Sequence, residues 1–241
     1  MSAAAPGGAG TGSSADAGGG QVRDLPDFLR RWSALHGGAS ATGLVGRWLG
    51  LVYSVARRIV GPLRRRGLGP DAVTWLGLFV ALTVPALTAA GGRWVLLAAL
   101  AAAASGLLDS LDGAVALLTG KGSSWGKVLD SVCDRVSDSA YLLAFWFLGA
   151  PWQLVLAAWF LSWMLEYVRA RACAAGMVEV GVVSVGERPT RVVTTVMFLL
   201  SAGLFDGIAA GWAFVGSGVW VVTGAIGLSQ VWEAARAHLR P

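Results

Sequence analysis

Four aspartates form two closely spaced pairs in an otherwise apolar part of the chain. Asp109 and Asp112 are three residues apart, and Asp130 and Asp134 are four residues apart. Residues with these spacings lie on one face of a helix, so the carboxylates of each pair point in the same direction. The nine-residue connection 117–125 makes the two helices antiparallel neighbours. All four carboxylates can therefore converge on one small volume and bind divalent cations there.

The apolar surroundings make these carboxylates energetically costly. Transfer scales assign about 2.5 to 3.5 kcal/mol to an aspartate at the centre of a membrane helix, so four cost on the order of 10 kcal/mol. Either some of them take up protons, or divalent cations bind among them and balance their charge. A ligand set made only of oxygens favours Mg²⁺ or Mn²⁺ over zinc. A solvated acidic face is the alternative, but the other faces of these helices are apolar.

Small residues accompany the aspartates at three positions, Gly113, Ala116 and Gly126. The absence of large side chains would let a bulky phosphate ligand approach the helix backbones closely. Tight helix packing explains small residues equally well when they are considered alone. Their position beside the carboxylates favours the ligand.

The helices that carry the aspartates belong to an all-α, polytopic membrane protein. The 241 residues are 55% hydrophobic and 14% charged, whereas about a quarter of the residues of soluble domains are charged. A helix of about 20 apolar residues crosses the hydrocarbon layer of a membrane. The predicted spans are residues 71–90, 93–118, 126–149, 152–173, 190–205 and 208–231.

The basic residues predict the orientation of these six spans. Of the 19 lysines and arginines, only Arg93 falls on the predicted outer side. Positive residues near short loops prefer the cytoplasm, so both termini and the aspartate end of the bundle are expected on the cytoplasmic side of a bacterial-type cell membrane. The net charge of +5 then reflects topology and attraction to anionic lipid. No nucleic-acid partner is expected.

The chain before the first span divides into two parts. Residues 1–42 begin with about twenty residues that are almost entirely Gly, Ala, Ser and Thr, and they are predicted to be a disordered or weakly ordered cytoplasmic segment. Residues 43–67 place apolar residues at helical spacing opposite arginines, which predicts an amphipathic helix lying on the membrane surface. Residues 70–235 form the predicted six-helix catalytic domain.

The pattern D-x-x-D-G-x-x-A, followed after a gap by G-x-x-x-D-x-x-x-D, resembles the signature of the CDP-alcohol phosphotransferases, a family of six-helix membrane enzymes. Seven fixed positions match, and the resemblance covers roughly residues 44–235. Residues 133–138, 167–171 and 187–191 resemble bacterial phosphatidylinositol-phosphate synthases within this family. Residues 69–74 resemble the stretch with which the family's first span begins.

The resemblance implies transfer of a phosphatidyl group from a CDP-diacylglycerol-type lipid to a small alcohol or phosphorylated alcohol, with release of CMP in phospholipid biosynthesis. It also implies a homodimer and two Mg²⁺ or Mn²⁺ ions that are held by the four aspartates and bind the CDP diphosphate. Asp134 would also act as the general base on the acceptor hydroxyl. The residues implied in CDP binding are Thr74, Gly113, Ala116, Gly126 and Lys127.

Three arginines are candidates for binding the acceptor alcohol. Arg169, Arg188 and Arg191 lie at the predicted cytoplasmic ends of the fourth and fifth spans, where they could bind an acceptor phosphate. Anchoring of the spans by positive charge is the alternative for each arginine. Glu166 and Asp138 also lie in predicted spans, and each is expected to pair with a nearby arginine.

Two positions depart from the family pattern. Leu117 stands where the family normally has an arginine that contacts the CDP diphosphate, and Ser124 stands where a second basic residue is often found. Lys121 or Lys127 could supply the charge, although a lysine lacks the bidentate geometry of arginine. A catalytically degenerate family member that acts as a scaffold or binding subunit is therefore an alternative.

An ion-coupled transporter is the second alternative, because acidic residues in membrane helices can relay ions. A relay distributes its acids across the depth of the bilayer. These four aspartates instead gather toward one side of it, which favours a single site.

Overall fold

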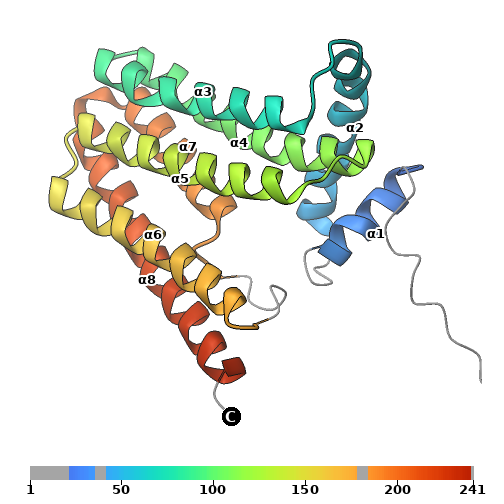
Figure 1. The fold of residues 1–241 in the computed structure, drawn as a ribbon. Coiled ribbons are helices and arrows are strands. Elements are labelled where there is room, and N and C mark those ends of the chain that lie inside the picture. The colour runs from blue at the N-terminus through green and yellow to red at the C-terminus, as the bar shows by residue number, and fades with distance from the viewer. Residues whose placement is uncertain (1–21, 36–41, 178–183, 240–241) are drawn as a thin grey trace, which may run out of the picture.

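The computed structural model describes residues 22–35, 42–177 and 184–239, and all regular elements in these ranges are helices (Figure 1). The elements are α1 (Leu25–Leu35), α2 (Gly43–Arg65), α3 (Pro70–Ala90), α4 (Trp94–Thr119), α5 (Ser124–Phe147), α6 (Trp152–Ala174), α7 (Arg188–Leu204), the 3₁₀ turn η1 (Asp206–Ile208) and α8 (Ala209–Leu239). The prediction of an all-α fold is confirmed. Each predicted span coincides with one of the helices α3 to α8.

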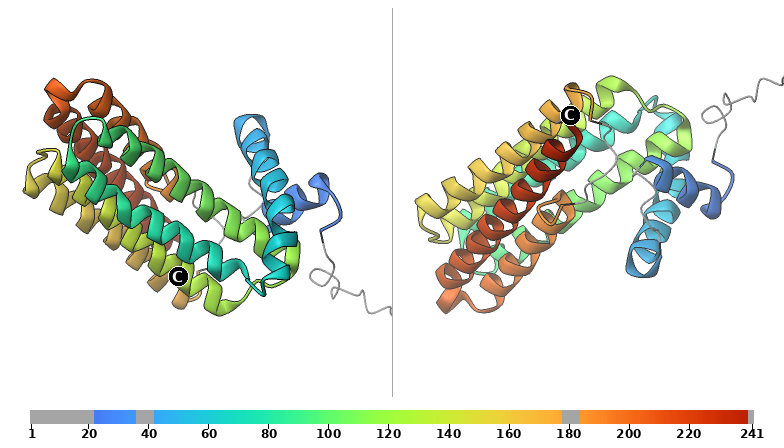
Figure 2. Two further views of the ribbon diagram at one scale, coloured as in Figure 1. Left: turned by 90° about the horizontal axis from the view of Figure 1, so that it is seen from above. Right: turned by 90° about the horizontal axis from the view of Figure 1, so that it is seen from below.

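The six helices α3 to α8 lie side by side in one bundle, and α1 and α2 lie at one end of it (Figures 1 and 2). Helix α3 packs against α4 and α5, α6 packs against α8, and α7 contacts both α4 and α8. Helix α2 packs against α4. The bundle therefore brings the aspartates of α4 and α5 close to the start of α7, which is distant in sequence.

Alanines make up much of the core of this bundle, whereas many of its large apolar side chains point outward. Phe79 is 61% exposed, Leu100 is 64% exposed and Trp152 is 58% exposed. Small residues at helix contacts and large apolar ones outside are typical of helices that pack within lipid. The fully buried core alanines are Ala81, Ala98, Ala102, Ala144, Ala158, Ala202 and Ala213.

Three segments in the described part of the chain are long and apolar enough to cross a membrane. They are α3, α4 and the segment Asp206–Leu239. Helix α5 carries the charged residues of the candidate site, and α7 has only 17 residues. The chain therefore has the composition of a membrane protein. The charged helix α5 and the short helix α7 are not among these three segments.

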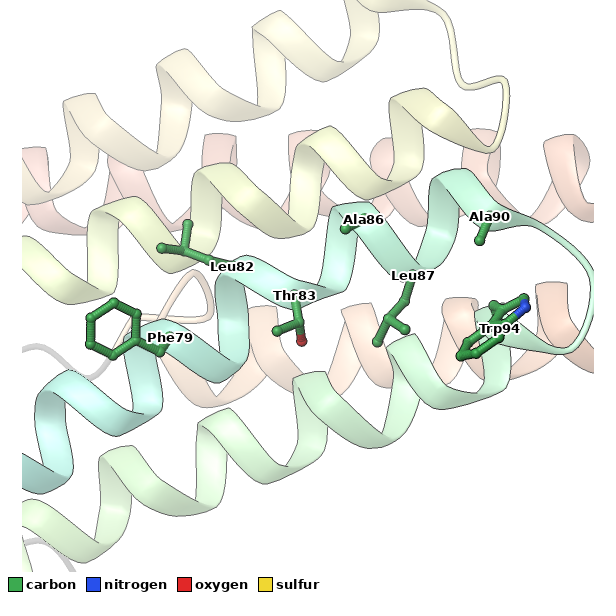
Figure 3. A pocket seen from close by; sticks show the side chains of 7 residues that line it. All are labelled: Phe79, Leu82, Thr83, Ala86, Leu87, Ala90 and Trp94. Atoms are coloured by element: carbon green, nitrogen blue, oxygen red, sulfur yellow. The ribbon is translucent and has the colours of Figure 1, made fainter.

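A surface groove of about 470 Å³ follows α3 and ends at Trp94 of α4 (Figure 3). Its lining consists of Phe79, Leu82, Thr83, Ala86, Leu87, Ala90 and Trp94. It contains no titratable side chain, so acid–base or metal chemistry has no basis there. The candidate site lies elsewhere, at a much smaller cavity.

The N-terminal segment differs from the prediction. Residues 1–42 were expected to be disordered or weakly ordered, but α1 forms within them, so the expectation was wrong for this part. The rest of that segment lies mostly outside the described residues. Phe28 of α1 is only 1% exposed, and its ring centroid lies 5.2 Å from that of Tyr53 in α2. Apolar side chains at helical spacing give α1 a face that packs on α2.

A helix, α2, forms within residues 43–67, for which an amphipathic helix on the membrane surface was predicted. One face packs into the protein through Leu49, Val52 and Ala56. Apolar residues near its start point outward, because Leu44 is 81% exposed and Leu51 is 52% exposed. The helix therefore has apolar surface available on a side that the bundle does not cover.

Candidate active site

The turn between α4 and α5 sets the two aspartate-bearing helices antiparallel. Gly120 ends α4 in the left-handed conformation, with φ of 64°. Such a conformation favours glycine because it has no Cβ. The side chain of Ser123 then caps α5 by accepting a hydrogen bond from the amide of Gly126 at 2.9 Å. These local signals fix the point at which each helix presents its carboxylates.

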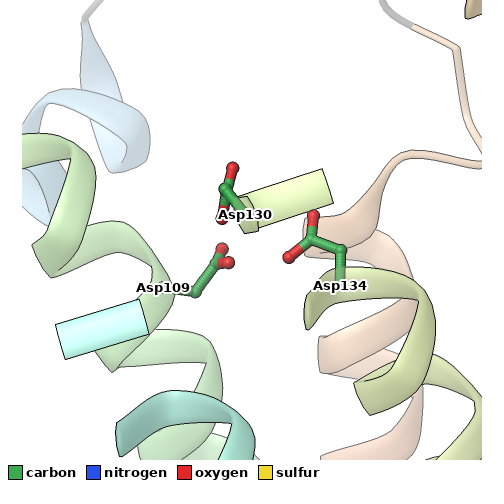
Figure 4. A group of neighbouring side chains, drawn as sticks. All are labelled: Asp109, Asp130 and Asp134. Carbon is green, nitrogen blue, oxygen red and sulfur yellow. The ribbon is translucent and has the colours of Figure 1, made fainter. Parts of the chain in front are cut away.

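Three of the four predicted metal ligands come together. Asp109, Asp130 and Asp134 each offer a carboxylate oxygen within 4.8 Å of those of the other two, and Figure 4 shows the side chains pointing toward one another. Oδ1 of Asp130 is buried and has no hydrogen-bond partner among the described residues. Three converging carboxylates with an unpartnered buried oxygen fit a divalent cation such as Mg²⁺ or Mn²⁺.

The fourth aspartate, Asp112, lies beside this group and not within it. It is 7% exposed, and its Oδ2 accepts a hydrogen bond of 2.6 Å from Oγ1 of Thr74 in α3. Both residues line a small cavity together with Asp109, Asp134 and Arg188. The structure thus places Thr74, predicted to contact CDP, as the residue that orients the carboxylate of Asp112.

Arg188, the first residue of α7, inserts its guanidinium between aspartates of two helices. Its Nη2 lies 3.3 Å from Oδ1 of Asp109, and its Nη1 forms an ion pair with Oδ1 of Asp134. The Arg188 side chain is 11% exposed. It was predicted only as an acceptor-binding residue. In this structure it is also the counter-ion of two predicted metal ligands.

A second charged group, here called the arginine cluster, consists of Arg135, Arg169 and Arg191, which surround the carboxylate of Glu166. Glu166 Oε1 lies 3.2 Å from Nη1 of Arg135 and 3.3 Å from Nη2 of Arg191. Glu166 Oε2 lies 3.7 Å from Nη1 of Arg169, which confirms the pairing expected from their spacing. Arg135 also lies 4.0 Å from Asp134, so the cluster adjoins the aspartates.

Asp138 and Glu187 complete the charge balance around the arginine cluster. Asp138 Oδ2 lies 3.4 Å from Arg135 and 3.2 Å from Arg191, as expected for an aspartate that pairs with a nearby arginine. Glu187 precedes α7 and accepts a hydrogen bond of 3.1 Å from Nη1 of Arg169. Burial raises the pKa of Glu187, but the hydrogen bonds from Arg169 and Ser184 and the charge of Arg169 outweigh it and hold the pKa below its usual value.

Sequence reasoning did not assign Arg135 or Asp138 to the site. The signal was present, because both are charged residues inside an apolar helix, one and four residues after Asp134. Their partners Glu166 and Arg191 lie on other helices, 25 residues or more away in sequence. Only the packing of α5, α6 and α7 reveals this connection.

The residues predicted to bind CDP differ in their surroundings. A Cβ on Gly113 would meet nothing within 4 Å, which leaves open space beside Asp112. A Cβ on Gly126 would lie 3.2 Å from Oγ of Ser123 and 3.4 Å from Oδ1 of Asp71, so packing already explains this glycine. Ala116 is half-buried and Lys127 is exposed. Open space for a ligand is therefore observed at Gly113 and not at Gly126.

Comparison with known proteins identifies the family of this chain. Residues 68–226 match the model of the CDP-alcohol phosphatidyltransferase family. The chain belongs to this family. Membership decides in favour of the transferase and against the ion-coupled transporter, and it makes the protein a metal-dependent enzyme of phospholipid biosynthesis.

Similar proteins share most of their length with this chain. A phosphatidylinositol phosphate synthase of Mycobacteroides abscessus is 32% identical over 76% of this chain and 82% of its own. An archaetidylinositol phosphate synthase of Pyrococcus horikoshii is 29% identical over 74% of this chain and 90% of its own.

Solved structures of the Mycobacterium tuberculosis phosphatidylinositol phosphate synthase resemble about three quarters of this chain. The complex of that enzyme with manganese and citrate has a TM-score of 0.63 and 29% identity, and covers 75% of this chain and 88% of the other. Its complex with CDP-DAG has a TM-score of 0.60 and 27% identity, and covers 74% and 94%. The likeness thus extends over most of the chain.

Proposed function

We propose that the protein transfers a phosphatidyl group from a CDP-diacylglycerol-type lipid to a small polar alcohol and releases CMP. The observation that carries this proposal is the convergence of Asp109, Asp130 and Asp134, with Asp112 beside them. A solved relative is bound to CDP-DAG and another complex of it contains manganese, which supports this donor and this kind of cofactor.

The four aspartates are the proposed ligands of two divalent ions, Mg²⁺ or Mn²⁺. When bound, such ions polarise the phosphorus and stabilise the departing CMP. The open space at Gly113 lets the diphosphate approach the backbone of α4. Ala116, Gly126, Lys127 and Thr74 remain proposed contacts of the CDP group, and Thr74 acts through Asp112.

Asp134 is the proposed general base. Its carboxylate accepts the proton of the acceptor hydroxyl, whose oxygen forms the new bond to phosphorus while the bond between phosphorus and CMP breaks. The neighbouring Arg135, at 4.0 Å, links Asp134 to the arginine cluster. Arg169, Arg188 and Arg191 are the proposed residues that hold the polar part of the acceptor beside this base.

The membrane arrangement supports the same function. We propose that α3 to α8 form a six-span catalytic domain (residues 70–235), with the site and both termini on the cytoplasmic side. Arg93 lies between α3 and α4, at the end of the bundle opposite the connection that contains Lys121. Helix α2, with exposed apolar residues, is proposed to lie on the membrane surface. The homodimer stays a prediction.

A CMP-release assay tests the proposed function. The purified protein, supplied with CDP-diacylglycerol and Mg²⁺ or Mn²⁺, is expected to release CMP only when a suitable alcohol is present. Removal of the divalent ion with EDTA is expected to abolish release, and restoring the ion should recover it. Absence of CMP release across a broad panel of alcohols would instead support the catalytically degenerate scaffold.

Leu117 provides a more specific test of donor binding. Leu117→Arg is expected to lower the KM for the CDP-lipid about tenfold, because an arginine there can form charge-assisted hydrogen bonds to the diphosphate. Leu117 is half-buried and packs against buried apolar residues of α2 and α4, so replacing it with arginine should lower the thermal stability somewhat. Leu118→Arg, which adds the same charge one residue later in the same cluster, is the control. Equal changes in KM for both variants would contradict the prediction.

A further inference from the structure

The carboxylate of Glu166 lies among the guanidinium groups of the arginine cluster. It contacts all three guanidinium groups, at 3.2 Å from Arg135, 3.3 Å from Arg191 and 3.7 Å from Arg169. Its side chain is 28% exposed, whereas those of Arg135 and Arg191 are 12% and 3% exposed. Glu166 therefore lies on the more open side of the two most buried arginines.

Counting charges shows what Glu166 does to this region. The three arginines of the cluster face three carboxylates, those of Asp138, Glu166 and Glu187, so the cluster carries no excess charge. Without Glu166, the excess would be one positive charge. A phosphate monoester carries nearly two negative charges at neutral pH.

We propose that Glu166 is a built-in anion that sets the charge of the acceptor, so that the site prefers a neutral polyol to the phosphate monoester of the same polyol. This proposal rests on the proposed function, because it concerns the acceptor of that reaction. A phosphate placed against the three guanidiniums would meet the Glu166 carboxylate at close range, and like charges at such distances repel strongly. Hydroxyl groups, in contrast, can accept hydrogen bonds from the arginines and donate them to Glu166.

This selection would distinguish the chain from the phosphatidylinositol phosphate synthases that it resembles, whose name specifies a phosphorylated product. The neutral and the phosphorylated acceptor differ in only one group that the site contacts. Both acceptors present a hydroxyl to Asp134, and the arginine cluster then receives either another hydroxyl or a phosphate.

Matched acceptor pairs test the proposal. CMP release from CDP-diacylglycerol with Mn²⁺ is measured with inositol against inositol phosphate, and with glycerol against glycerol phosphate. The wild type is expected to have the higher kcat/KM for the neutral member of a pair. Glu166→Gln keeps the shape and removes the charge, and it is expected to shift the ratio toward the monoester at least about tenfold.

Two variants separate the charge of Glu166 from a structural role. Glu166→Asp keeps the charge and should keep the wild-type ratio, even if overall turnover falls. Glu233→Gln makes the same change at an exposed position of α8 and should change neither the ratio nor turnover. Preference of the wild type for the monoester, or an unchanged ratio in Glu166→Gln, would overturn the proposal.

A binding measurement keeps this test independent of turnover. Glycerol phosphate is titrated calorimetrically into the Mn²⁺-loaded protein without donor, and Glu166→Gln is expected to bind it at least about tenfold more tightly than the wild type. Absence of CMP release from every pair would refute the proposed function alone. Equal or weaker binding of glycerol phosphate by Glu166→Gln would refute the role of Glu166.

Discussion

Replacing Asp134 with asparagine is expected to reduce CMP release by about a thousandfold or more, since general bases typically contribute 10² to 10⁴ and Asp134 is also a proposed metal ligand. The asparagine has nearly the same shape but cannot accept the proton of the acceptor hydroxyl. Donor binding should be retained in part, because Asp109, Asp112 and Asp130 remain. The measurements are single-turnover CMP release and equilibrium binding of the CDP-lipid, both at saturating Mn²⁺.

Asp206→Asn is the matched control for this variant. Asp206 is exposed in the 3₁₀ turn after α7, at the opposite end of that helix from Arg188 and the aspartates that Arg188 contacts, so its replacement should change neither rate nor binding. Turnover of Asp134→Asn close to that of the wild type would exclude Asp134 as the base. Complete loss of donor binding would show instead that the residue serves mainly to hold the metal.

The lengths of the apolar stretches made the bundle predictable, because glycine, proline and polar turns separate the stretches that form α3 to α8. The N-terminal segment was harder to predict, because α1 has a polar surface and is short. An isolated helix of 11 residues is marginally stable in water. It forms here because Phe28 is buried against Tyr53, a contact between residues 25 positions apart.

The candidate site was predictable where its residues share a helix. The spacing of Asp130 and Asp134 indicates a common face, and the structure places both with Asp109. The contact of Arg188 with the aspartates depends on how α7 packs against α4, which the spacing within either helix does not determine. The arginine side chain meets these aspartates only because the helices that carry them pack together in the folded protein.

Arg188→Gln is expected to destabilise the metal-free protein more than the metal-loaded one. Without a divalent ion, the guanidinium of Arg188 is the counter-ion of Asp109 and Asp134, to which it is ion-paired in a largely buried position. Removing one partner of a buried ion pair typically costs about 3 to 5 kcal/mol, because the other charge is left uncompensated. A bound cation would compensate the same carboxylates, so Mn²⁺ should restore most of the lost stability.

The same variant is expected to bind Mn²⁺ more tightly than the wild type, since the ion no longer competes with Arg188 for the two carboxylates. Linkage requires this, because Mn²⁺ can stabilise the variant more than the wild type only if it binds the folded variant more tightly. The measurements are thermal unfolding in EDTA and in Mn²⁺, together with calorimetric titration of Mn²⁺. Arg236→Gln, at an exposed position near the end of α8, controls for the loss of one positive charge. Equal destabilisation of Arg188→Gln with and without Mn²⁺, or weaker Mn²⁺ binding, would show that Arg188 supports the metal site instead of competing for it.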